Sequence, residues 1–252
     1  MTTERFFNRH EFKYVITEET AAGVLESIQP HMKRDRHTNE EAHYRISSLY
    51  FDTRENLFHE EYLREEVFRQ KLRLRVYNQP SLMDHCFFEI KKKFQGFVSK
   101  RRAQLTLAST YAWLEGRVTT DEICQAFPEE AHVIREIDFL RTHYKLEPRV
   151  VISYIRQAHV GIFDDTLRVT MDRQLTRRYT HLQPHMLPAT DTGYLPDSRV
   201  VLEVKSSGTI PLWLARTLSG LSCRKQAFSK YSTSYNTPET NDTAVVTDRR
   251  HA

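Results

Sequence analysis

Charged and apolar residues alternate along several stretches of this sequence. Arg69, Lys71, Arg73 and Arg75 stand two residues apart, which is the spacing that places side chains on one face of a β-strand. Neighbouring cations in such a row repel each other by about 2.4 kcal/mol at an effective dielectric of about 20. The row is therefore tolerable on an open surface, whereas in an enclosed space it needs a bound anion.

A Glu-x-Lys pattern adds carboxylates to the charged faces of other stretches. It occurs at Glu11/Lys13, Glu89/Lys91 and Glu203/Lys205. Carboxylates hold hard divalent cations, and ammonium and guanidinium groups hold phosphate oxygens. We interpret the combination as a site for a metal-bound phosphate chain. For any single strand the alternative is a solvent-facing side of a sheet, because antiparallel sheets commonly have one wet face.

The elements that must position these residues are strands with helices between them. Period-two alternation predicts about eight strands, mostly antiparallel. The strand candidates are 11–16, 43–52, 69–77, 87–93, 96–106, 149–157, 167–172 and 200–205. Apolar residues at helical spacing predict helices after Thr17, over 128–144 and from Pro211. A barrel with the charged faces turned inward would form a tunnel for a polyanion.

Composition sets the broad class of the protein. The 252 residues contain 37 Lys and Arg against 33 Asp and Glu, and this mild excess does not by itself indicate a nucleic-acid binder. Three cysteines without a CxxC pair indicate neither a zinc knuckle nor a disulfide framework. No apolar run is long enough for a membrane-spanning segment and no signal peptide is evident. We expect a cytoplasmic protein with one domain over 1–236 and a polar, disordered tail over 237–252.

An ordered series of motifs carries a family resemblance. The motifs are R-x-E-x-K-Y at 9–14, S-L-Y-F-D-T at 48–53, K-x-R-x-R at 71–75, E-x-K at 89–91, S-K-R-R at 99–102, L-R-x-T-x-D at 167–172, V-L-E-V-K at 201–205 and F-S-K-Y at 228–231. In this order they resemble the VTC domain, named after the vacuolar transporter chaperone complex. Arg9 stands where the related CYTH branch has a glutamate, which favours the VTC branch over the triphosphatases.

The resemblance implies an α+β fold, an antiparallel eight-stranded β-tunnel (the triphosphate tunnel barrel) with flanking helices. Eukaryotic members of the family move the γ-phosphate of a nucleoside triphosphate onto a growing polyphosphate chain with manganese or magnesium. We therefore expect a polyphosphate polymerase-type phosphotransferase, with a divalent metal (Mn or Mg) as cofactor. Its expected partners are ATP or another nucleoside triphosphate and inorganic polyphosphate, and no nucleic acid.

Residue roles also follow from the resemblance, position by position. The expected catalytic residues are Arg73, Arg75, Lys91 and Glu203, with Glu203 also the metal ligand. The expected substrate-binding residues are Lys13, Lys71, Lys100, Arg156, Arg168, Lys205 and Lys230. Phosphoryl transfer depends on positioning and charge neutralisation more than on a covalent catalyst, so such a set of cations with one metal ion suits it.

Three other functions stay open at this point. A triphosphatase or polyphosphatase of the same fold needs the same cradle and differs in whether water reaches the γ-phosphate. A non-catalytic module could bind polyphosphate without turnover. A basic sheet that binds RNA is the third, because the stretch 93–100 (KFQGFVSK) partly matches the RNP1 pattern, although it lacks the glycine after the lysine.

Overall fold

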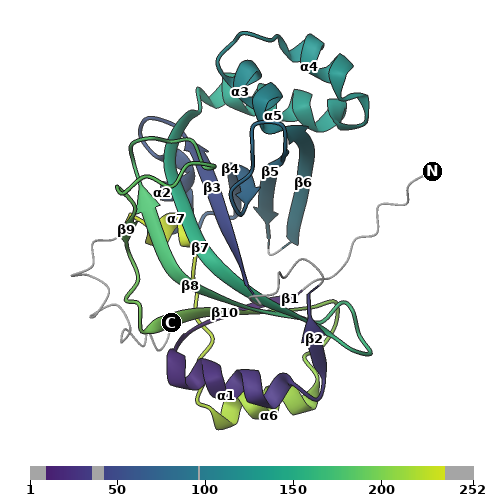
Figure 1. The fold of residues 1–252 in the computed structure, drawn as a ribbon, viewed down its shortest axis with the longest axis vertical. Coiled ribbons are helices and arrows are strands. Elements are labelled where there is room, and N and C mark those ends of the chain that lie inside the picture. Colours follow the sequence, from purple (N-terminus) through teal and green to yellow (C-terminus); the bar gives the residue numbers. More distant parts are fainter. Residues whose placement is uncertain (1–9, 36–42, 96, 236–252) are drawn as a thin grey trace. The chain divides into compact units, whose positions relative to one another are not determined.

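The computed structural model describes residues 10–35, 43–95 and 97–235 (Figure 1). Arg9 and the predicted tail over 237–252 lie outside the described residues. The chain divides into two compact units, each assembled from separate segments. The first unit comprises Met1–Tyr44, Tyr154–Leu175 and Leu195–Ser229, and the second comprises Arg45–Ser153, Thr176–Tyr194 and Lys230–Ala252. The predicted single domain over 1–236 stays a prediction.

The first unit is built on an antiparallel sheet with two helices against it. Its strands follow the order β1 (His10–Thr17), β10 (Arg199–Ser206), β8 (Arg168–Arg178) and β7 (Glu147–Gly161), and β2 (Met32–Arg34) pairs with β7. Helices α1 (Glu18–Ile28) and α6 (Leu212–Gly220) lie side by side along this sheet (Figure 1). The core contains Val24, Ile28, Leu202, Val204 and Leu214.

Helix α1 begins where the sequence predicts it. The side chain of Thr17 accepts a hydrogen bond of 3.1 Å from the backbone N–H of Thr20, and Glu18 and Glu19 occupy the first turn. Both features stabilise a helix N-terminus, because they satisfy a free N–H and complement the positive end of the helix dipole. Apolar residues on one face of α1 then bury against the strands, which leaves the opposite face of the sheet for charged residues.

The second unit contains parts of β7 and β8 together with the four strands β3 to β6. Its strand order is β7, β3 (Tyr44–Asp52), β4 (Phe68–Tyr77), β5 (His85–Phe94) and β6 (Phe97–Thr106), and β9 (Thr192–Gly193) pairs with β8. Its helices are α2 (Leu57–Leu63), α3 (Leu107–Leu114), α4 (Thr120–Ala126), the 3-10 turn η1 (Pro128–Glu130), α5 (Ala131–Tyr144) and α7 (Lys230–Thr233). Residues of α3, α4 and α5 share one core with the apolar face of β4, β5 and β6.

The strand register places charged side chains side by side within each unit. Lys13 of β1 lies opposite Glu203 of β10, which lies opposite Thr170 of β8. In the second unit Arg73 of β4 lies opposite Glu89 of β5. Directly opposed residues of antiparallel strands share a face, so the alternation seen in the sequence becomes a continuous charged face in each unit.

The structure confirms the α+β class, the antiparallel pairing and the helix that starts after Pro211. Eight strands form the main path, and β2 and β9 pair beside it. The closed tunnel barrel is wrong: the path ends at β1 and β6, and no ladder between these strands is present in the described residues. Closing a sheet into a barrel requires hydrogen bonds between its two end strands. Alternation of residues along a strand carries no signal for such pairing, so the sequence could not show that the sheet is open.

Several element boundaries also differ from the prediction, and β8, predicted over 167–172, continues to Arg178. Strand β7 runs over Glu147–Gly161, well beyond the predicted 149–157. The predicted helix over 128–144 is divided into η1 and α5, since Pro128 starts a 3-10 turn ahead of the α-helix. Among the helices that the structure describes, none is long and apolar enough to cross a membrane.

Candidate functional site

The predicted site residues fall into two charged groups, one in each unit. The first unit holds Lys13, Arg156, Arg168, Glu203 and Lys205. The second unit holds Lys71, Arg73, Arg75, Lys91, Lys100 and Lys230. In each group three cations approach one buried carboxylate, Glu203 in the first unit and Glu89 in the second. We call them the Glu203 cluster and the Glu89 cluster.

In the Glu203 cluster three cations approach one carboxylate. Lys205 Nζ lies 3.3 Å from Glu203 Oε2, and Arg156 Nη2 lies 3.6 Å from the same oxygen. Lys13 Nζ lies 3.9 Å from Oε1. Burial lowers the pKa of Lys205, while Glu203 and Glu11 act in the opposite direction. The three cations come from β1, β7 and β10, so the sheet register itself assembles the site.

Further carboxylates balance the charge of these cations. Arg156 Nε and Nη2 donate hydrogen bonds of 2.6 and 2.7 Å to the two oxygens of Asp172, which is buried. Burial works against the charge on Arg156, but Asp172 holds the pKa of this guanidinium well above its usual range. Lys13 Nζ lies 3.2 Å from Glu11 and donates to the backbone carbonyl of Phe228 at 3.0 Å. Lys13, Lys205 and Arg156 therefore face three carboxylates, and the cluster is close to neutral.

Two polar atoms in the first unit are buried without a hydrogen-bond partner in the part of the chain that the structure describes. One is Thr170 Oγ1, whose residue lies directly opposite Glu203 in the strand register. The other is Nε of Arg168, a residue whose Nη2 binds Asp35 at 2.5 Å and Tyr44 at 3.2 Å. Buried polar atoms are normally paired, so both atoms indicate a ligand or water at this face.

The Glu89 cluster carries a surplus of positive charge. Arg73 Nε lies 2.7 Å from Glu89 Oε2, Arg75 Nε lies 3.8 Å from the same oxygen, and Lys100 Nζ contacts Oε1. Burial works against the charge of Glu89, yet these three cations hold its pKa well below its usual range. With three cations around one carboxylate, the cluster has a net positive charge and can bind anionic oxygens.

Lys71 and Lys91 adjoin this cluster through the strand register, whereas Lys230 lies on helix α7. Lys91 lies opposite Lys71 on one side and opposite Lys100 on the other. Lys71 Nζ also lies 4.7 Å from the ring centroid of Tyr62. Burial lowers the pKa of Lys100 to about 8, with Glu89 acting against this shift. Rows of opposed lysines are costly without an anion, which agrees with an anion-binding face.

Tyr50 is a member of this face that the sequence analysis did not assign. Its hydroxyl accepts a hydrogen bond of 3.1 Å from Arg73 Nη1, and its ring stacks on Tyr231 with centroids 4.8 Å apart. Burial raises the pKa of Tyr50, but Arg73, Arg75 and Lys230 outweigh it, so the pKa is lowered overall. The available signal was its period-two spacing from Ser48, whose hydroxyl accepts from Arg75 Nε at 3.3 Å.

The fit of a divalent cation can be tested on the donors present. Glu203 and the unpaired Thr170 hydroxyl offer oxygen donors on one face, and hard cations such as Mg²⁺ and Mn²⁺ take oxygen ligands. No group of three or more His, Cys, Asp or Glu residues suited to a metal occurs within 10–35, 43–95 and 97–235. The donors therefore fit a cation that completes its coordination with phosphate oxygens and water, as Mg²⁺ commonly does.

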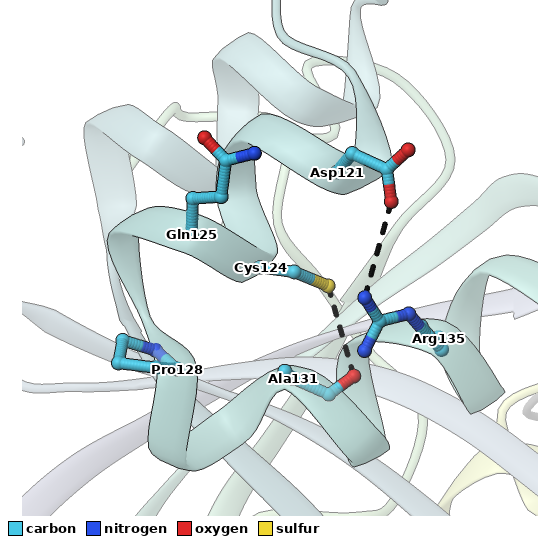
Figure 2. A pocket seen from close by; sticks show the side chains of 6 residues that line it. All are labelled: Asp121, Cys124, Gln125, Pro128, Ala131 and Arg135. Carbon is cyan, nitrogen blue, oxygen red and sulfur yellow. Dashed lines mark hydrogen bonds and ion pairs between the residues drawn. The ribbon is translucent and has the colours of Figure 1, made fainter.

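A pocket in the second unit is lined by none of the predicted site residues. It is formed by α4, η1 and α5 and is lined by Asp121, Cys124, Gln125, Pro128, Ala131 and Arg135 (Figure 2). Arg135 and Asp121 approach to 3.9 Å across it, and the thiol of Cys124 donates to the carbonyl of Ala131 at 3.7 Å. With one cation beside one carboxylate, this pocket lacks the positive charge of the Glu89 cluster.

Comparison with known families decides the assignment, because the model of the VTC domain matches residues 8–238. The chain belongs to the VTC-domain family. Membership relates this VTC-domain protein to polyphosphate chemistry.

Solved structures also resemble this VTC-domain protein at low sequence identity. The bh2851 protein of Bacillus halodurans, described as a candidate adenylate cyclase, is 16% identical with a TM-score of 0.46, over 87% of this chain and 92% of that one. HpAC1 of Hippeastrum, described as a candidate adenylyl cyclase with a dominant triphosphatase activity, is 13% identical with a TM-score of 0.47, over 89% and 93%. The PH1819 protein of Pyrococcus horikoshii OT3 is 10% identical with a TM-score of 0.41, over 86% and 92%. No curated protein sequence matches the chain.

Proposed function

We propose that this VTC-domain protein is a polyphosphate polymerase that transfers the γ-phosphate of ATP to a polyphosphate chain. The observation that carries the proposal is the net positive charge around buried Glu89, where Arg73, Arg75 and Lys100 converge on one carboxylate. Anionic phosphate oxygens can replace that carboxylate as partners of the cations. The VTC-domain match supplies the class of substrate.

Within the second unit we assign phosphate binding to the Glu89 cluster. Arg73 and Arg75 present guanidinium groups that can bind two oxygens at once. Lys91, Lys100 and Lys71 add point charges on the same face. The hydrogen bond from Arg73 to Tyr50 holds the guanidinium in place before substrate arrives, and preorganised charge of this kind stabilises a transition state without reorganisation cost.

Within the first unit we assign metal-bound phosphate to the Glu203 cluster. Glu203 and Thr170 would hold the divalent cation, which supplies charge neutralisation at phosphoryl oxygens when bound. Lys13, Lys205 and Arg168 would bind phosphate oxygens beside it. Arg156 is tied to Asp172 by two short hydrogen bonds, so in this proposal it orients the cluster and contributes charge.

The reaction itself balances without an added acid or base. The bond between the γ-phosphorus and the bridging oxygen of ATP breaks, and ADP leaves with that oxygen. A terminal oxygen of the polyphosphate chain forms the new bond to phosphorus. That oxygen is already ionised at neutral pH, so no general base is needed, and catalysis consists of positioning and charge neutralisation. The cytoplasmic setting predicted from the sequence is part of this proposal, because it supplies ATP.

The test is a chain-elongation assay. Purified protein is incubated with ATP, manganese and a short polyphosphate primer, and the products are resolved by gel electrophoresis and assayed for free phosphate. The wild type should give a lengthening ladder, and Glu203→Ala and Arg75→Ala should each abolish it. Glu136→Ala and Arg135→Ala are matched controls, because their ion pairs with Lys92 and Asp121 lie outside both clusters.

Each other outcome rejects either the polymerase activity or the assigned site. Free phosphate without a ladder would reassign the protein as a triphosphatase or polyphosphatase. Tight polyphosphate binding with neither product would leave a non-catalytic binding module. A ladder that survives both substitutions would mean that the two clusters are not the site of transfer.

A further inference from the structure

Three phenylalanines are exposed at one end of the β4–β5–β6 sheet in the second unit. Phe68 lies opposite Phe94, and Phe94 lies opposite Phe97. Because directly opposed residues share a face, the three rings stand side by side across three strands. They are 40%, 52% and 73% exposed, respectively. The described residues leave these side chains partly exposed, although the same face carries the buried core further along the strands.

Aliphatic residues extend this apolar surface on the neighbouring turns. Leu63 and Val67 belong to the end of α2 and the turn before β4, and Val98 follows Phe97 on β6, where it lies opposite Lys93 on the other face of the strands; all three are exposed. The backbone N–H of Gln95, the residue after β5, donates a hydrogen bond of 3.3 Å to the carbonyl of Val67, which connects the turn before β4 to the end of β5. We call the surface formed by Leu63, Val67, Phe68, Phe94, Phe97 and Val98 the phenylalanine rim. Exposed apolar residues gathered at one end of a sheet, on both of its faces, mark an interaction site.

The surroundings of the rim are strongly basic. The stretch 91–102 contains six Lys and Arg and no acidic residue. Two of these cations, Lys92 and Arg101, are paired with Glu136 of α5. Lys93 lies opposite Arg69 on the other face of the strands. The acidic residues Glu65 and Glu66 sit on the turn beside Val67, and they offset only part of this charge.

The charge and the apolar side chains together select the kind of partner. A second copy of the chain would bring a basic stretch against a basic stretch, and like charges at an interface are unfavourable. Single-stranded RNA would suit the basic residues and the aromatic rings, since bases stack on rings. It offers no comparable contact to the aliphatic side chains of Leu63, Val67 and Val98. A bilayer rich in anionic lipids accommodates all of them.

We propose that the phenylalanine rim inserts into the surface of an anionic lipid bilayer, with the flanking basic residues against the headgroups. Aromatic and aliphatic side chains partition into the headgroup and acyl boundary, and Lys and Arg strengthen the attachment to anionic lipids. Association of this kind is peripheral and reversible, and it requires no membrane-spanning helix. The rim residues have no part in the proposed phosphate chemistry, although two cations of the flanking stretch, Lys91 and Lys100, belong to the proposed phosphate site. The vesicle test substitutes rim residues alone, so the two proposals can fail separately.

Vesicle co-sedimentation of the full chain tests the proposal. Wild-type protein should sediment with phosphatidylcholine vesicles that contain phosphatidylglycerol, and much less with phosphatidylcholine alone. The double substitution Phe94→Ser and Phe97→Ser should weaken this binding by at least about tenfold, as expected from removing two buried aromatic side chains from the bilayer. Phe163→Ser is the matched control, because Phe163 is 97% exposed in the first unit and lies outside the rim. High salt should reduce wild-type binding.

Several results would overturn the proposal. These are equal sedimentation of wild type and the double variant, no sedimentation of the wild type, or equal binding to vesicles with and without anionic lipid. If the double substitution removed RNA binding or dimerisation while wild type ignored vesicles, the rim would be an RNA or self-association surface instead. Circular dichroism and thermal melting should be unchanged in the double variant, because both side chains are exposed, and polyphosphate chemistry in solution should be retained.

Discussion

The hydroxyl of Tyr231 donates a 2.6 Å hydrogen bond to Oδ2 of Asp52, a carboxylate buried in the second unit. Asp52 also accepts hydrogen bonds from the backbone N–H groups of Phe58 and His59, at 2.9 and 3.0 Å. The carboxylate thus joins the end of β3, the start of α2 and helix α7. Because Lys230 is the first residue of α7 and is itself buried, this bond fixes one of the predicted phosphate-binding lysines.

Removing the hydroxyl with Tyr231→Phe should therefore affect both stability and ligand binding. Loss of a buried hydrogen bond to a carboxylate should lower the free energy of unfolding by about 1.5–3 kcal/mol. The stacking of the ring on Tyr50 is preserved, so the remaining effect is a looser Lys230. We expect a several-fold weaker affinity for tripolyphosphate, measured by isothermal titration calorimetry, alongside urea denaturation.

Tyr111→Phe is the control for Tyr231→Phe. The Tyr111 hydroxyl shares a 2.8 Å hydrogen bond with Nδ1 of His185, and neither residue belongs to the Glu89 cluster. This variant should lose stability and keep its tripolyphosphate affinity. Equal affinities in the two variants would show that Tyr231 has a purely structural role.

The pKa of Lys100 gives a pH dependence with a defined sign. Burial lowers this pKa to about 8, whereas an exposed lysine in the unfolded chain titrates near its ordinary value of about 10.4. Between these values the unfolded state binds more protons, so this group makes the protein more stable as pH rises from about 8 to about 10.4. Phosphate binding changes in the opposite direction, because the neutral amine no longer attracts the anion.

Lys100→Arg separates this effect from the titration of the substrate. A guanidinium stays charged throughout the range, so the variant should keep its tripolyphosphate affinity between pH 7 and pH 9.5, values chosen to bracket a pKa of about 8. The wild type should lose affinity by up to about tenfold per pH unit above its pKa, the limit for one coupled proton. Identical pH profiles would exclude Lys100 as the titrating contact.

Much of the charged face could be predicted from the sequence, because period-two alternation of charge is a local signal. It placed Lys13, Glu203, Arg73 and Glu89 on faces that the register then brought together. Whether such strands close into a barrel depends on pairing between distant segments, and alternation is the same for an open and a closed sheet. The closed tunnel was therefore predicted wrongly although the strands were correct.

Contacts between residues far apart in the sequence could not be predicted from it either. Tyr231 and Asp52, which share a hydrogen bond, are 179 residues apart in the sequence. Each belongs to a family motif, and neither motif indicates that the two side chains meet. The family resemblance implied that Arg156 contacts substrate, and a basic residue in a sequence shows its charge but not its partner. Its bidentate pair with Asp172 depends on the register of β7 against β8, and this register became visible only in the structure.

Breaking that pair with Asp172→Asn should be strongly destabilising. Asparagine can accept one hydrogen bond from Arg156 but leaves its charge buried without a counter-ion of equal strength. Removing one partner of a buried ion pair costs about 3–5 kcal/mol, which urea denaturation would measure. Asp121→Asn is the control, because the Asp121–Arg135 pair is exposed with 3.9 Å between its atoms, and such pairs contribute about 0–1 kcal/mol. Similar losses in both variants would contradict the assigned role of Asp172.

Thr170 offers a separate test of the metal assignment. Its hydroxyl is buried without a hydrogen-bond partner in the described residues and lies opposite Glu203. Burying an unpaired hydroxyl is unfavourable, so Thr170→Val should leave the free energy of unfolding unchanged or raise it by about 1 kcal/mol. If the hydroxyl takes part in holding the cation, the same variant should need several-fold more manganese for half-maximal activation and should bind manganese more weakly in calorimetry with tripolyphosphate present.

The matched control is Thr176→Val, six residues further along β8. Its hydroxyl is also buried without a partner in the part of the chain described here, but its residue pairs with Gly193 of β9 and not with β10. It should show the same stability change and no change in manganese dependence. A shift in manganese dependence for both variants, or for neither, would remove Thr170 from the metal site and leave Glu203 as its one assigned protein ligand. Greater stability together with weaker manganese binding, found for Thr170→Val and not for Thr176→Val, would show that the Thr170 hydroxyl is kept for a ligand, since folding gains nothing from it.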